Sequence, residues 1–178
     1  ILDSLDQDVS NKLLQQVADE LLAYQTKVVQ LVCDRFATDL AFVVFSDNLA
    51  DKNGLRIPLD DFEAVFSERI QRLIHPAKEH GLLTVLHTDG KVETSIPLIQ
   101  QLGFDAVYIA QPELCDLVAL KEMGNGMLSF MGGIPVSTLI NGTSPDHIQT
   151  LNSLFSSNGG YVAGVSGEIT DDVPMENY

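Results

Sequence analysis

Five short apolar runs, separated by segments with helical periodicity, most constrain what this chain can fold into. Each run has five or six mainly aliphatic or aromatic residues, as in a strand that is buried on both faces. Strands that alternate with helices are typical of βαβ units, in which the strands lie parallel in one sheet. The runs occupy residues 40–45, 82–86, 106–110, 127–131 and 160–165.

The segments between the runs predict amphipathic helices, because their apolar residues recur at a period close to 3.6. The longest covers 11–36, with Asp8 or Ser10 as its N-cap. The next, 59–80, carries an inner stripe of apolar residues and an internal proline that should kink its last turns. One further helix is expected to end just before Gly103, another to cover 114–123, and a third to run from 145 to 156. The stripe consists of Phe62, Phe66, Ile70 and Leu73, the proline is Pro76, and Gly81 is the expected helix stop.

Length, charge and cysteine content limit the classes of protein to which this chain can belong. The chain has 178 residues, enough for one domain with a substantial core. Its net charge of −15 argues against nucleic acid and anionic membranes as partners, since both require clustered Lys and Arg. Two cysteines, no secretion signal and no window long enough to span a membrane indicate a cytoplasmic protein.

Polar and glycine residues follow the apolar runs, and in parallel α/β sheets the carboxyl ends of strands are where ligands bind. Ser46 and Asp47 follow the first run, and His87 and Asp89 follow the second. His87 and Asp89 could act as a metal pair or as a general acid–base pair. Alternatively, Asp89 caps the next helix and His87 hydrogen-bonds a loop carbonyl.

Two further features leave alternatives open. Asp47 could bind a ligand or could anchor a loop. Gly132 and Gly133 follow the run at 127–131, where their amides could approach an anionic group or could form a tight turn.

The order of five motifs resembles that of the uroporphyrinogen decarboxylase superfamily, which also contains the corrinoid-dependent methyltransferases. The resemblance implies a (β/α)8 TIM barrel, of which 1–178 would form one C-terminal portion: a leading helix over 1–36 and about the last five βα units over 37–178. The motifs are VVFSDNLADKNGLRIPLDDF, TVLHTDG, LGFDAV, FMGGIPVSTLINGTSPDHI and NGGYVAGVSGEITDDVPMEN.

The resemblance implies a decarboxylase that acts on a polycarboxylated tetrapyrrole or a related small molecule without a cofactor. It also leaves two alternatives: a methyltransferase that uses zinc and a corrinoid protein, and a non-catalytic barrel. The chain departs from the defining residues of both enzyme branches. Asp47 stands where the decarboxylases have Ser, Gly167 stands where they have His, and Asp89 and Gly167 replace the two zinc-binding Cys of the methyltransferases.

These considerations select the candidate site residues and the expected association. A partial barrel has two free sheet edges, so we expect a fragment of a full barrel, which should form a homo-oligomer through those edges. The catalytic candidates are Asp47, His87 and Asp89; the substrate-binding candidates are Ser46, Asp47, Gly132, Gly133 and Glu168; and the metal-binding candidates are His87, Asp89 and Glu168.

Overall fold

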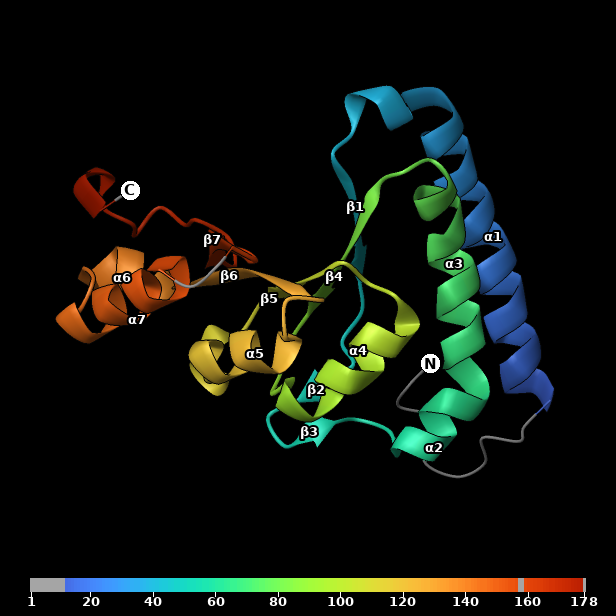
Figure 1. The fold of residues 1–178 in the computed structure, drawn as a ribbon, viewed down its shortest axis with the longest axis horizontal. Coiled ribbons are helices and arrows are strands. Elements are labelled where there is room, and N and C mark those ends of the chain that lie inside the picture. Colours follow the sequence, from blue (N-terminus) through green and yellow to red (C-terminus); the bar gives the residue numbers. More distant parts are fainter. Residues whose placement is uncertain (1–11, 157–158, 178) are drawn as a thin grey trace. The chain divides into compact units, whose positions relative to one another are not determined.

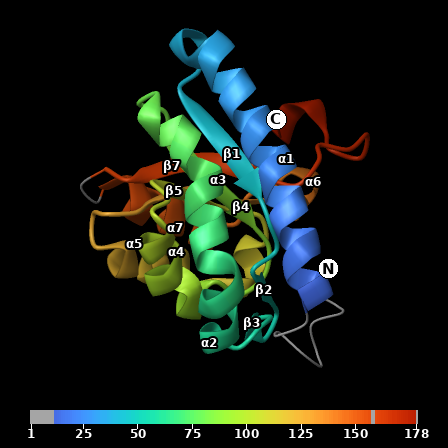
Figure 2. The same cartoon turned by 90° about the vertical axis from the view of Figure 1, so that its right-hand side faces the viewer.

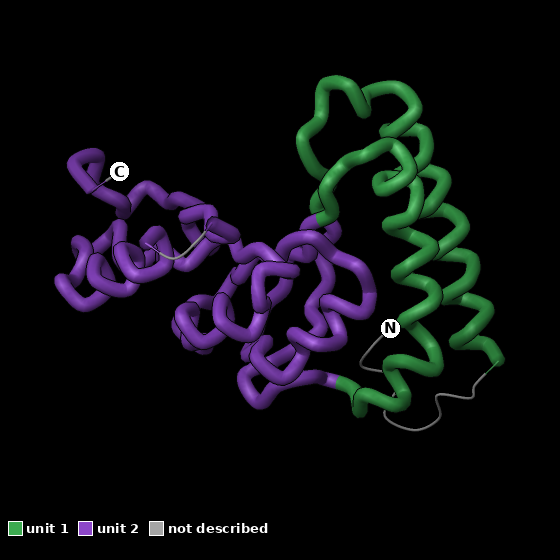
Figure 3. Tube along the Cα trace, viewed as in Figure 1, with its two compact units in different colours: residues 1–44, 57–84 green, residues 45–56, 85–178 purple. Residues whose placement is uncertain are grey.

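A computed structural model describes residues 12–156 and 159–177 (Figure 1). The chain forms two compact units, which Figure 3 shows in different colours. Unit 1 comprises residues 1–44 and 57–84, and unit 2 comprises residues 45–56 and 85–178. Each unit is therefore built from segments that are separated in the sequence.

Unit 1 is organised around two long helices. Helix α1 (Lys12–Phe36) lies against α3 (Glu68–Glu79), as Figures 1 and 2 show. Buried Cys33 and Ala77 pack together with Leu82 in a small core at one end of the pair. The α1 helix confirms the expected helix over the described part of 11–36, while the expected caps Asp8 and Ser10 lie outside the described residues.

Helix α3 ends as the sequence predicts. Gly81 has a φ of +73°, and its N–H donates to the carbonyl of Lys78 at 3.0 Å. The N–H of Leu82 donates to the carbonyl of Ala77, also at 3.0 Å. These two bonds form a Schellman motif, which needs a residue in the left-handed conformation that glycine adopts easily.

A five-stranded parallel sheet has the order β1-β4-β5-β6-β7, which confirms the predicted order of the five strands. Within residues 12–156 and 159–177, strands β1 and β7 are the outermost in this order, so each has one neighbouring strand in the sheet. The strands are β1 (Phe42–Ser46), β4 (Leu83–Thr88), β5 (Ala106–Ile109), β6 (Ser129–Pro135) and β7 (Tyr161–Ser166).

One face of the strands of unit 2 carries a large part of its core. Leu86 pairs in register with Val107, which pairs with Phe130, and all three side chains are buried. Residues in register on parallel strands point to the same face. The helices of unit 2 contribute further buried side chains, including Ile99, Leu102 and Leu120.

Local sequence signals set the ends of the unit 2 helices. The Asp116 carboxylate accepts hydrogen bonds from the N–H groups of Val118 and Ala119, and so caps α5. The Ser144 hydroxyl accepts from the N–H of His147 at 3.2 Å, which confirms the predicted start of α7. The helices are α4 (Ile96–Leu102), α5 (Leu117–Gly124), α6 (Val136–Asn141) and α7 (Pro145–Ser156).

The expected single helix over 59–80 is wrong in one respect. It consists of α2 (Leu59–Phe62), a π-helical turn over Glu63–Ser67, and α3. The π turn inserts one extra residue and shifts the register of all that follows. Ile74 and Ala77 are therefore buried in α3, whereas Ile70 and Leu73 of the predicted stripe are only partly buried.

A short hairpin precedes helix α2. Strand β2 (Ala50–Asp51) pairs antiparallel with β3 (Gly54–Leu55). Asn53 and Gly54, residues that are common in turns, lie at this hairpin, and the Asp51 carboxylate accepts from the N–H of Asn53. Polar turn residues indicated the reversal, but two-residue strands are too short to leave a periodic pattern.

Candidate active site

Ser46 and Asp47 end strand β1. Ser46 is its last residue, and both residues are exposed to solvent. Protein atoms around the Asp47 carboxyl still remove part of its hydration, and this desolvation raises its pKa from the ordinary value. The N–H of Asn48 and the positive charge of Arg56 oppose the rise, since both stabilise the carboxylate.

His87 lies inside β4 and not in a polar segment after it, because β4 extends through Thr88. Its ring is half-buried and packs against the ring of Tyr108 on β5, with centroids 5.3 Å apart. The main-chain carbonyl of His87 accepts a hydrogen bond of 3.1 Å from the N–H of Asp47. The structure therefore brings two of the three catalytic candidates together through their backbones.

Asp89, the third catalytic candidate, is half-buried and follows the end of β4. The short 3₁₀ helix after it, Glu93–Ser95, has Val92 at its N-cap position and no capping side chain. The alternative in which Asp89 caps this helix is therefore wrong.

Gly90 fixes the backbone next to Asp89. Its N–H donates to the side-chain oxygen of Gln111 at 3.0 Å, and its carbonyl accepts from the thiol of Cys115 at 3.4 Å. A Cβ on Gly90 would lie 2.5 Å from the carbonyl carbon of Ala50. Contacts with Gln111, Cys115 and Ala50 thus fix the turn after β4. The sequence pattern did not indicate the contributions of Gln111 and Cys115.

Thr88 is a further residue that the sequence pattern did not single out. Its side chain is fully buried, and its hydroxyl accepts a hydrogen bond from the N–H of Leu49 at 3.2 Å. The same hydroxyl donates to the carbonyl of Asp89 at 3.3 Å. A hydroxyl in an otherwise apolar strand was the available signal, because a buried hydroxyl needs hydrogen-bond partners.

Gly132 and Gly133 lie within β6, so their expected placement after a strand is wrong. They pair in register with Ala163 and Gly164 of β7. The carbonyl of Gly132 accepts from the Tyr161 hydroxyl at 2.8 Å, and a Cβ on Gly133 would lie 2.7 Å from that hydroxyl oxygen. The glycines therefore make room for a tyrosine, which the sequence did not indicate because the partner is on another strand.

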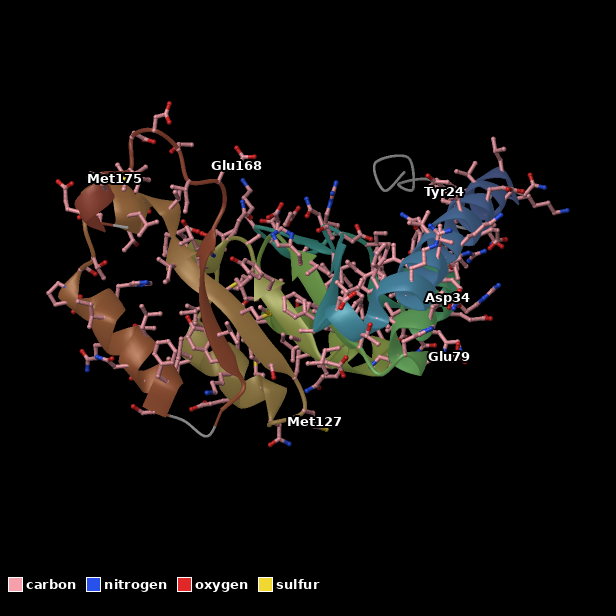
Figure 4. All side chains as sticks on the ribbon, turned by 90° about the horizontal axis from the view of Figure 1, so that it is seen from above. Tyr24, Asp34, Glu79, Met127, Glu168 and Met175 are labelled. Carbon is pink, nitrogen blue, oxygen red and sulfur yellow. The ribbon has the colours of Figure 1, made fainter. Side chains whose placement is uncertain are left out.

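Glu168 follows β7 and is exposed, on the loop labelled in Figure 4. Within residues 12–156 and 159–177, no three His, Cys, Asp or Glu side chains are grouped so that they could hold a metal ion. His87, Asp89 and Glu168 thus do not assemble the three protein ligands that a catalytic zinc requires. These three residues therefore do not fit a zinc site.

Comparison with known proteins identifies the family. The model of the uroporphyrinogen decarboxylase (URO-D) family matches residues 7–178. The chain belongs to the uroporphyrinogen decarboxylase family. This confirms the resemblance that the five motifs indicated, and it places the described α/β sheet in a family of decarboxylases. No curated protein matches the chain.

In the described part of the chain, none of the helices has the length and apolar character needed to cross a bilayer. The site candidates that the structure brings together, Asp47 and His87, lie within the matched region, Asp47 directly after β1 and His87 near the end of the neighbouring strand β4.

Proposed function

We propose that the protein is a decarboxylase-like enzyme that acts on a polycarboxylated tetrapyrrole, or on a related small molecule, without a cofactor. The observation that carries the proposal is the raised pKa of Asp47, in a member of this family, at the end of a strand beside His87. A carboxyl group with a raised pKa keeps its proton to a higher pH, which suits a general acid.

The proposed reaction breaks the bond between a substrate carbon and its carboxylate and releases CO2. The electron pair of that bond moves into the substrate, where a protonated pyrrole ring can accept it. A proton then replaces the lost carboxylate on carbon. Asp47 is the proposed proton donor, and the Asn48 N–H and the Arg56 charge, which stabilise its carboxylate, would allow it to release the proton.

His87 and Asp89 are the other proposed members of the site. His87 is half-buried beside the end of β1, and its imidazole is a side chain that can take or return a proton. Asp89 lies in a fixed turn and is proposed to contact a polar group of the substrate. Ser46 and Glu168, both exposed at strand ends, are proposed as outer substrate contacts.

The test is release of CO2 from a uroporphyrinogen-type substrate by the full-length protein. We expect Asp47→Asn to lower kcat by about 10²- to 10⁴-fold, the usual contribution of a general acid. Glu122→Gln, which changes an exposed carboxylate on α5, is the matched control and should leave kcat unchanged. Failure of the wild-type protein to bind such a substrate or to release CO2 would refute the proposal.

A further inference from the structure

A row of side chains crosses one face of the sheet at the level of His87. His87 pairs in register with Tyr108, Tyr108 with Met131, and Met131 with Val162. In register on parallel strands, these four side chains share one face. It is the face opposite the buried Leu86, Val107 and Phe130, and the four side chains of the row are half-buried or exposed.

Tyr108 reaches across this row. It belongs to β5, yet its hydroxyl donates a hydrogen bond of 2.6 Å to the carbonyl of Val165 on β7. The side chain therefore passes over β6, the strand between them. The hydroxyl has a fixed acceptor two strands away, while the ring contacts His87 on the neighbouring strand on the other side.

Two glycines provide the space for this crossing. A Cβ on Gly164 would lie 2.9 Å from the Tyr108 hydroxyl oxygen, and one on Gly132 would lie 3.3 Å from a ring carbon. Any larger residue at Gly164 would displace the hydroxyl from Val165. The position of Tyr108 on β5 thus depends on Gly132 of β6 and Gly164 of β7.

A second tyrosine provides an internal comparison. Tyr161 on β7 donates from its hydroxyl to the carbonyl of Gly132 at 2.8 Å, so it also ties two strands together. Its ring contacts Phe155 and not His87. Burial raises the pKa of both tyrosines, which keeps both hydroxyls as hydrogen-bond donors at neutral pH.

We propose that Tyr108 is a positioning residue that holds the imidazole of His87 in its working orientation. The hydrogen bond to Val165 fixes the tyrosine ring, and the fixed ring limits the rotation of the imidazole packed against it. The catalytic part of this inference rests on the proposed function of His87. The orientation itself can be measured without any activity.

The experiment compares Tyr108→Phe with Tyr161→Phe in the full-length protein. Each variant keeps its ring and loses one hydroxyl–carbonyl hydrogen bond of similar length, so the loss of folding stability should be similar. The first readout is the NMR resonance of the His87 ring, assigned among the histidine resonances by its loss in His87→Gln. The second is kcat for decarboxylation.

We expect Tyr108→Phe to shift the His87 resonance and to lower kcat by up to about a hundredfold, with little change in KM. Tyr161→Phe should change neither. An unshifted resonance in Tyr108→Phe, equal shifts in both variants, or a shift without loss of kcat would each overturn the inference. If the wild-type protein has no decarboxylase activity, the proposed function fails, while the resonances alone still show whether Tyr108 orients His87.

Discussion

The N–H of Asp47 donates a hydrogen bond of 3.1 Å to the main-chain carbonyl of His87. Two residues that lie forty positions apart in the sequence are therefore held next to each other by backbone atoms, with no contribution from their side chains. Substitutions at either position can change the chemistry of the site and leave this contact in place. The predictions for Asp47 rest on this property.

The stability of the protein should respond to pH through Asp47. Its pKa in the folded state is raised, so the folded protein holds this proton more tightly than the unfolded chain. The contribution of Asp47 to stability is therefore present at low pH and is lost as the pH rises through the folded-state pKa. We expect Asp47→Asn to be more stable than the wild type at pH 7.

Chemical denaturation at pH 7 and at pH 4 measures this difference, which should shrink at the lower pH. Glu122→Gln is the control, because it removes one negative charge from a strongly acidic protein at an exposed site. If Asp47→Asn and Glu122→Gln gain the same stability at pH 7, the effect comes from net charge and not from the surroundings of Asp47.

Gly90 should tolerate no side chain. Its φ is +82°, and an added Cβ would collide with the backbone of Ala50. Gly126 has a similar φ of +73° but open space around it, so Gly126→Ala measures the cost of the conformation alone, about 1 to 2 kcal/mol. We expect Gly90→Ala to lower the free energy of unfolding by roughly 1 to 3 kcal/mol more, as in overpacked sites.

Thermal or urea unfolding of these two variants gives the comparison directly. Equal losses for Gly90→Ala and Gly126→Ala would mean that the turn after β4 can move away from Ala50. Activity should fall in Gly90→Ala as well, because the displaced turn carries Asp89.

Chelation should leave decarboxylase activity unchanged. His87, Asp89 and Glu168 are not grouped as a ligand set, and acid–base decarboxylation needs no metal. The measurement is kcat before and after dialysis against EDTA, with the zinc content determined by elemental analysis. One zinc per chain, with loss of activity on its removal, would favour the methyltransferase alternative with its corrinoid partner.

The outer strands of the sheet should support self-association. Val162 on β7 is 53 % exposed and β7 has one neighbouring strand, so its free edge can pair with another chain. We expect light scattering to show a concentration-dependent oligomer, which Val162→Lys should weaken by placing a charge beside that edge. Oligomers that resist Val162→Lys would indicate association elsewhere, and a monomer at all concentrations would contradict the prediction.

The strands could be predicted well because a buried strand is a contiguous apolar run in the sequence. The runs that became β5 and β7 are contiguous and apolar, and glycine or helical patterns bound them. The end of β4 was predicted too early, at Leu86, because His87 and Thr88 are polar. Their polarity reflects the partners they meet, a tyrosine ring and a backbone N–H, and not the end of the strand.

The candidate site was predictable only in part. His87 and Asp47 could be selected because polar residues at the ends of parallel strands tend to meet, and here their backbones do. The supporting contacts from Gln111 and Tyr108 could not be found this way. They depend on which residues lie opposite each other on neighbouring strands, and this register cannot be determined from one amino-acid sequence.

The π-helical turn at Glu63–Ser67 makes the inward face of α3 depend on the number of residues before it. Each residue of an α-helix advances it by about 100°. Deleting one residue within that turn would restore a regular helix and rotate everything after it by this angle. Ile74 and Ala77 would leave the interior, although no residue in α3 had changed. For this segment, a deletion within the π-helical turn would therefore do more harm than most substitutions in α3.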